Sequence, residues 1–134
     1  MKQSICAVFL AFAGIVAAPA QAQSADEMYG RFDVLWDNAV PPVDSCESRN
    51  RIDAVCGRSA DKLVCTANAI YVALEESGLA DRFPRQISGL NRLLSQKADY
   101  FNKLITGGHM QNAADMGAFE MRDFCRDIGA PLIP

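Results

Sequence analysis

The sequence is poor in the residues and motifs on which most enzymes and metal sites depend. It has a single histidine, His109, among 134 residues. It contains no Gly-x-Ser-x-Gly elbow, no His-Glu-x-x-His pair, no phosphate-binding glycine-rich loop and no calcium-loop pattern. No Cys-x-x-Cys spacing is present either, which argues against zinc, redox and haem sites. The sequence therefore predicts no catalytic residue, no metal site and no bound cofactor.

Runs of one kind of residue are also scarce. Lysine and arginine are interleaved with acidic residues, which argues against nucleic-acid binding. After the N-terminal region no apolar run is long enough to span a membrane. No stretch alternates polar and apolar residues with a period of two, so strands are not expected. These absences leave an all-helical fold as the expectation.

The first 22 residues have the pattern of a secretory signal peptide. Lys2 supplies a short positive start, and residues 5–18 form an apolar run. Small-x-small motifs end at Ala20 and Ala22, so we expect cleavage after Ala22 and a single mature domain over 23–134. The loss of Lys2 leaves 12 basic residues against 16 acidic ones, a net charge of −4. Export would place this domain in the periplasm or outside the cell.

Cleavage would also remove Cys6 and leave four cysteines: Cys46, Cys56, Cys65 and Cys125. Four cysteines in an exported domain of this size predict two disulfides, each stabilising by about 2–4 kcal/mol. Neither Cys56–Cys65 nor Cys46–Cys65 suits a regular helical hairpin, because a bridge needs Cα atoms within about 7 Å. The pairing stays open, except that Cys125 must join one of the other three.

The clearest helix covers residues 59–78. Ser59 is the expected N-cap, and Gly78 is the expected left-handed residue after the last turn. One apolar stripe of helical period follows the helix: Leu63, Val64, Ala67, Ile70, Tyr71 and Leu74. Cys65 lies opposite this stripe. We therefore expect the stripe to meet the next long helix, and a disulfide of Cys65 to draw the polar segment 46–57 over the other face.

Upstream of this helix the sequence predicts one regular helix and one weak segment. A capping box at 24–27 begins the helix, and Pro41-Pro42 ends it. Its apolar face consists of Met28, Phe32, Leu35, Trp36 and Ala39. Trp36 is in phase with that face, so we interpret it as a core residue. A second capping-box spacing at 44–47 begins a short polar helix or turn that ends near Gly57.

Downstream, residues 85–106 form the longest periodic stretch and are predicted to be one helix. Its inner face consists of Ile87, Leu90, Leu94, Phe101 and Ile105. Gly89 costs about 1 kcal/mol relative to alanine inside a helix, which suggests a close contact between helices there. Asn91 and Tyr100 fall outside the stripe and are expected on the surface.

The candidate functional loop follows and consists of Gly107, Gly108 and His109. The two glycines permit backbone angles that other residues avoid, and His109 could serve as a general base or a pH-sensitive contact. A catalytic histidine needs a nucleophile or an orienting acid, which the sequence cannot place. An ordinary loop histidine beside a helix end is the simpler interpretation. The last helix is predicted over 112–128, with Cys125 on its inner face.

Together these patterns predict an all-α fold, a small compact bundle of about four main helices plus one short helix, stapled by two disulfides. The missing catalytic motifs, the small stapled architecture and an acidic balance that suits a basic partner favour an exported binding module. It would act by protein–protein contact on another envelope or secreted protein, as inhibitor and immunity proteins do. The alternatives are a small periplasmic hydrolase using His109 and a structural envelope protein.

Overall fold

The computed structural model describes residues 31–130, so the predicted signal peptide and the capping box at 24–27 lie outside the described residues. The chain divides after Asp33 into two units, and the following description concerns the second one. Residues 31–48 are helical, and four further helices follow. They are α3 (Ala54–Glu76), α4 (Pro84–Gln96), α5 (Ala98–Thr106) and α6 (Ala118–Asp127), with two 3-10 turns, η1 (Ala80–Arg82) and η2 (Ala113–Asp115). Within 31–130 there is no strand, and the disulfides are Cys46–Cys56 and Cys65–Cys125. The predicted all-α fold with two disulfides is confirmed.

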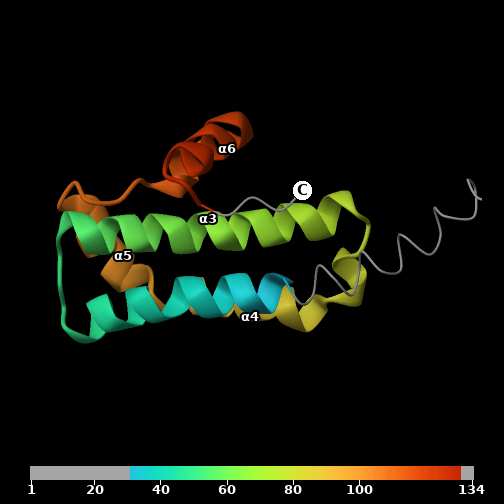
Figure 1. The fold of residues 1–134 in the computed structure, drawn as a ribbon, viewed down its shortest axis with the longest axis horizontal. Coiled ribbons are helices and arrows are strands. Elements are labelled where there is room, and N and C mark those ends of the chain that lie inside the picture. Colours follow the sequence, from blue (N-terminus) through green and yellow to red (C-terminus); the bar gives the residue numbers. More distant parts are fainter. Residues whose placement is uncertain (1–30, 131–134) are drawn as a thin grey trace, which may run out of the picture. The chain divides into compact units, whose positions relative to one another are not determined.

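The central element is α3. The 34–48 helix, α4 and α5 lie on one side of α3, and α6 lies on the other (Figure 1). The first side holds the main core, whose buried residues are Val43, Cys46, Cys56, Ala60, Leu63, Tyr100, Phe101, Leu104 and Met110. Removing this apolar surface from water is the dominant favourable contribution to folding. The expectation that the apolar stripe of the central helix meets the next long helical stretch is confirmed.

The N-terminus of α3 lies upstream of the predicted one. Asp53 is the N-cap, and its Oδ1 accepts a hydrogen bond from the Cys56 N–H at 2.9 Å. That bond, together with the Arg51 guanidinium 2.8 Å from Oδ2, lowers the pKa of the Asp53 carboxyl. The prediction that Ser59 caps the helix was therefore wrong. Gly57, predicted to follow a preceding segment, lies inside α3 and is buried.

Two further predicted helix ends have different outcomes. At the end of α3, Gly78 adopts φ +73° and the Leu79 N–H bonds to the Leu74 carbonyl at 2.9 Å, as predicted for a left-handed C-terminal residue. Asn112, the first residue of the helix predicted over 112–128, acts as a cap, since its side chain accepts a hydrogen bond from the Ala114 N–H at 3.2 Å. The element that it caps, however, is the short turn η2. The single helix predicted over 112–128 is replaced by η2, an extended link and α6.

The second face of α3 is covered by α6 and not by the segment 46–57. Cys65 pairs with Cys125, across a sequence separation of 60 residues, and both side chains are buried. Met121 and Ala130 complete this smaller core cluster. The predicted covering by the segment 46–57 was wrong because Cys46 bonds to Cys56 within that same segment.

The helix before α3 runs through Pro41-Pro42, which were predicted to end it. A proline inside a helix lacks its N–H donor and costs about 3 kcal/mol. Packing opposes this cost, because Val43, directly after the prolines, is fully buried in the main core. The helix ends at residue 48, and Asn50 then adopts the left-handed conformation with φ +49°. The capping-box spacing at 44–47 thus lies inside a helix.

The single helix predicted over 85–106 is two helices, α4 and α5, that meet at Lys97. The Lys97 side chain is buried, and its Nζ donates to Asp44 Oδ1 at 2.5 Å and to Glu47 Oε1 at 2.7 Å. Burial alone would lower the pKa of Lys97, but the hydrogen bonds to these two carboxylates raise it, and the net shift is upward. Asp44 and Glu47 are therefore partners of a buried cation, one helical turn apart on the same face.

Tyr100 shows the effect of this break on the packing. It was predicted to lie on the surface, but it is 4% exposed, and its hydroxyl donates to the Arg51 carbonyl at 2.6 Å. The apolar phase counted from Ile87 does not continue into α5, because the helix is interrupted at Lys97. The close helix contact predicted at Gly89 was also wrong, since a Cβ built there would meet nothing within 4 Å.

Candidate functional site

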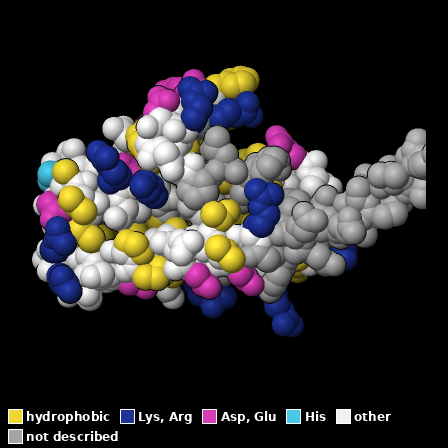
Figure 2. Space-filling view, viewed as in Figure 1, with side chains coloured by type: hydrophobic (Ala, Val, Ile, Leu, Met, Phe, Trp, Pro, Cys, Tyr) yellow, Lys and Arg dark blue, Asp and Glu magenta, His cyan; other side chains and the backbone are white. Residues whose placement is uncertain are grey.

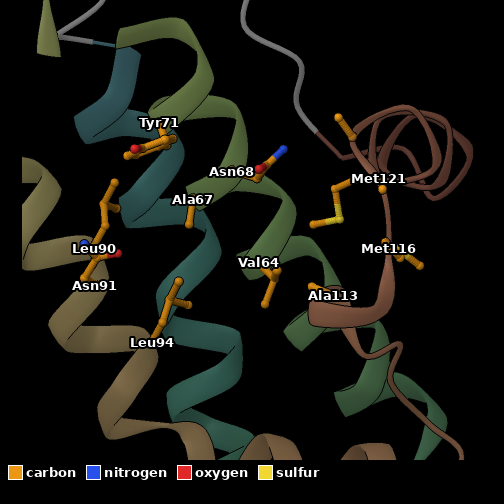
Figure 3. A pocket seen from close by; sticks show the side chains of 12 residues that line it. Val64, Ala67, Asn68, Tyr71, Leu90, Asn91, Leu94, Ala113, Met116 and Met121 are labelled. Carbon is orange, nitrogen blue, oxygen red and sulfur yellow. The ribbon is translucent and has the colours of Figure 1, made fainter. Parts of the chain in front are cut away.

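A groove of about 450 Å³ opens between α3, α4 and the segment from η2 to α6 (Figure 3). Its lining residues are Val64, Ala67, Asn68, Tyr71, Leu90, Asn91, Leu94, Ala113, Met116, Gly117, Ala118 and Met121. None of them carries a formal charge. A concave site with mostly apolar walls and a few polar groups is the usual form of a binding site.

The α3 wall of the groove is one edge of the predicted apolar stripe. Val64, Ala67 and Tyr71 follow each other at helical spacing, with Asn68 on the same face. The helices on the main-core side do not cover this edge completely, and Tyr71 remains 44% exposed. Tyr71 was predicted to belong to the stripe that meets the next helix, but it lies at the rim of the groove.

The opposite walls come from α4 and from the segment before α6. Leu90 and Leu94 present the edge of α4, and Asn91 stands between them, exposed as predicted (Figure 3). Met116 and Met121 line the remaining side. Methionine side chains are flexible and polarisable, so they adapt to apolar ligands of different shapes. The groove thus offers apolar contacts together with two side-chain amides that can donate and accept hydrogen bonds.

The Tyr71 hydroxyl is held by its own helix. Glu75, one turn further along α3, hydrogen-bonds to this hydroxyl and, with its negative charge, raises the pKa of Tyr71. An exposed, neutral aromatic ring with a polar tip is the type of residue that anchors protein contacts.

The predicted functional loop lies elsewhere, at the end of α5. Gly107 caps this helix, and Gly108 has φ +79°. The Gly108 N–H bonds to the Ile105 carbonyl at 3.0 Å, and the His109 N–H bonds to the Leu104 carbonyl at 2.8 Å. This pattern is the Schellman motif, which ends helices with a left-handed glycine. The two glycines and the histidine backbone are accounted for by helix termination.

The main chain of this loop packs closely on α3. A Cβ built on Gly57 would lie 1.9 Å from the His109 carbonyl oxygen, so only glycine fits at this point of α3. The next residue, Met110, is buried in the main core. No hydrogen bond joins the His109 imidazole to a hydroxyl or carboxylate among residues 31–130. The geometry gives His109 a packing role through its backbone and no catalytic pair within that range.

Asp61 fixes the far end of the same loop. It is 9% exposed, and its Oδ1 accepts a hydrogen bond from the Gln111 N–H at 3.1 Å. Burial raises the pKa of the Asp61 carboxyl to about 6, although the Gln111 N–H and the positive charge of Arg58 act in the opposite direction. Local pattern alone does not predict this burial, because Asp61 is a charged residue outside the apolar stripe of α3.

The substitution Asp61→Asn is expected to raise the free energy of unfolding by about 2 kcal/mol at pH 7. A carboxyl whose folded-state pKa is raised stabilises the fold when protonated, so this contribution is full below about pH 4 and is lost as pH rises through about 6. The amide avoids burying a charge and keeps an acceptor for the Gln111 N–H. Urea unfolding of both proteins at pH 4 and pH 7 measures the difference. The exposed Asp81→Asn is the control, and an equal gain at both pH values would contradict the explanation.

Neither the remaining described residues nor the comparisons with known proteins indicate a second functional site. Among residues 31–130 no group of three or more His, Cys, Asp or Glu could hold a metal ion. No helix within the same residues has the length and apolarity needed to cross a membrane. On the face seen in Figure 2, basic, acidic and apolar side chains are interspersed. No family model matches the chain, and neither the comparison with curated proteins nor the one with solved structures found a match.

Proposed function

We propose that this protein is an exported binding module that acts by protein–protein contact, in the manner of an inhibitor or immunity protein. In this proposal residues 1–22 direct export and are removed, and the mature domain works in the periplasm or outside the cell. Two disulfides support such a location, because disulfides persist in oxidising compartments. The partner is another envelope or secreted protein.

The groove between α3, α4 and α6 is the observation that carries the proposal. It combines uncharged apolar walls with an exposed aromatic anchor, Tyr71, and with the amides of Asn68 and Asn91. Interfaces of this kind derive most of their affinity from a few buried anchors, and tyrosine is enriched among them. The alternative of a hydrolase using His109 has no comparable support, since His109 does not line this groove.

Capture experiments with matched variants test the proposal. The mature domain would be immobilised and exposed to an envelope extract, and bound proteins would be quantified at increasing extract concentration. We expect one saturable partner whose binding falls at least tenfold with Tyr71→Ala or with Asn91→Arg, because truncating an anchor residue typically costs about 2 kcal/mol or more, and about 1.4 kcal/mol is already tenfold. Asn91 is exposed, so a charge there should block the groove and leave the core intact.

Val55→Ala is the matched control for these variants. Val55 is also an exposed apolar residue of α3, at 66%, but it does not line the groove. Capture that is equal for the wild type and all three variants would show that the groove is not the contact site. If no saturable partner is captured at all, the binding proposal fails and the structural envelope alternative becomes the better account.

A further inference from the structure

A second hollow adjoins the groove at the rim formed by Tyr71. It lies between the end of α3, the turn η1 and the start of α4, and its lining residues are Tyr71, Glu75, Ala80, Asp81, Pro84, Ile87, Ser88 and Asn91. Tyr71 and Asn91 also line the groove, and Figure 3 shows their side chains on α3 and α4. The two hollows are therefore neighbouring parts of one surface, which continues past Tyr71 towards the end of α3.

The second hollow differs from the groove in its charge. Its lining includes two carboxylates, Glu75 and Asp81, and no lysine or arginine, whereas the groove lining carries no formal charge. Both acidic residues are exposed, and neither forms an ion pair within residues 31–130. Arg82 and Arg85 are close in the sequence but do not line the hollow. The apolar groove thus leads to a negatively charged end that no basic side chain of the described residues neutralises.

The spacing along α3 fits a short extended segment. On this helix the groove runs from Val64 to Tyr71, seven residues that rise about 10 Å, and Glu75 lies about 6 Å further on. Five extended residues span roughly 13 Å, and their alternate side chains point to the same side. Two apolar side chains at positions one and three can therefore lie in the groove while a long basic side chain at position five reaches the carboxylates.

We propose that the groove and the hollow beyond Tyr71 together bind an extended segment of a partner protein in which apolar side chains are followed by a lysine or arginine. The apolar side chains lie between α3, α4 and α6, where they leave water, and the basic one lies beside Glu75 and Asp81. The inference rests on the proposed function, because it specifies the chemistry of the partner at the same site. It adds charge selection, since an acidic residue at that end of the segment would meet two like charges.

Titration of the full mature chain with synthetic peptides, followed by nuclear magnetic resonance, tests the proposal. The probes are the capped pentapeptides Leu-Ser-Leu-Ser-Arg and Leu-Ser-Leu-Ser-Gln, together with the same pair in reverse order to cover both chain directions. We expect saturable shifts of the Ala67 and Met121 methyl signals, which report on the groove. One of the arginine peptides should bind about threefold more tightly than its glutamine counterpart, because exposed charge pairs contribute modestly. Added salt should reduce this preference by screening.

Two double variants assign the preference to the second hollow. Glu75→Gln with Asp81→Asn removes both charges and keeps an acceptor for the Tyr71 hydroxyl, and we expect the preference for arginine to disappear. Glu76→Gln with Asp99→Asn removes the same charge from exposed positions that line neither hollow, so it should keep the preference.

Three results would overturn the proposal. The first is the absence of a saturable shift with every peptide. The second is equal binding of the arginine and glutamine peptides, or a preference that persists without the charges of Glu75 and Asp81. The third is a set of groove shifts that depends on protein concentration alone, which would assign the surface to a second copy of this chain. Equal peptide binding would leave a captured partner at the groove unaffected, whereas a failed capture would leave the peptide preference standing, so the two failures are distinguishable.

Discussion

A variant with Cys65→Ala and Cys125→Ala is expected to lose about 4 kcal/mol of unfolding free energy. The disulfide closes a sequence separation of 60 residues, and in the chain-entropy account the stabilisation rises with the length of the closed loop. Replacing both cysteines leaves no free thiol that could form another pair. Urea or guanidinium unfolding of the oxidised proteins, at a fixed pH, measures the change.

The loss should also have a specific location. On α6 only Met121 and Cys125 are buried, so without the disulfide few apolar contacts hold this helix on α3. We expect amide exchange of residues 118–130 to accelerate by at least a hundredfold, while α3 and α5 change only by the loss of global stability. The predicted disulfide from Cys65 to the segment 46–57 would have placed the effect in that segment. The observed pairing with Cys125 places it in α6.

The paired control is Cys46→Ala with Cys56→Ala. Its loop has a separation of only 10 residues, so the expected loss is smaller, about 3 kcal/mol. Its effect on exchange should centre on the connector before α3 and leave α6 protected. If the two double variants lost stability equally, or if α6 stayed protected without its disulfide, the account of α6 as a covalently held helix would be wrong.

Local sequence signals predicted most helices of this fold, but not where one helix ends and the next begins. Apolar periodicity and a terminal glycine located the body and the end of α3. The predicted helix boundaries were wrong where tertiary contacts outweigh local conformational preference. Val43 is buried so deeply that a helix continues through two prolines, and Lys97 interrupts a helix where its ammonium group reaches two carboxylates. The two carboxylates lie far from Lys97 in the sequence, so no local pattern could reveal this contact.

The candidate site was beyond the reach of the sequence for a related reason. Val64, Ala67 and Tyr71 are recognisable as apolar stripe residues, as is Leu90 on the next helix. Whether a stripe is covered depends on the width and position of the neighbouring helices, which periodicity does not encode. The loop predicted as a candidate site, around His109, contains two glycines because α5 ends there.

The substitution Gly57→Ala is expected to lower the free energy of unfolding by about 2 kcal/mol, because an overpacking cost of about 3 kcal/mol exceeds the gain in helix propensity. The higher helix propensity of alanine favours the variant by about 1 kcal/mol. Against this, the new Cβ would lie 1.9 Å from the His109 carbonyl oxygen and 2.6 Å from its carbonyl carbon. Both are main-chain atoms of a loop that Met110 and Gln111 anchor, so the conflict cannot be relieved by a side-chain rotation.

A matched control exists in Gly89→Ala. Gly89 is also inside a helix, but nothing lies within 4 Å of its added Cβ, so only the propensity gain of about 1 kcal/mol should appear. The two variants thus carry the same chemical change with opposite expected signs. Displacement of the loop in Gly57→Ala should also rehydrate Asp61 and return its pKa from about 6 towards that of an exposed carboxyl. Titration of the Asp61 carboxyl by nuclear magnetic resonance would show this shift, and an unchanged pKa with unchanged stability would mean that the loop does not rest on Gly57.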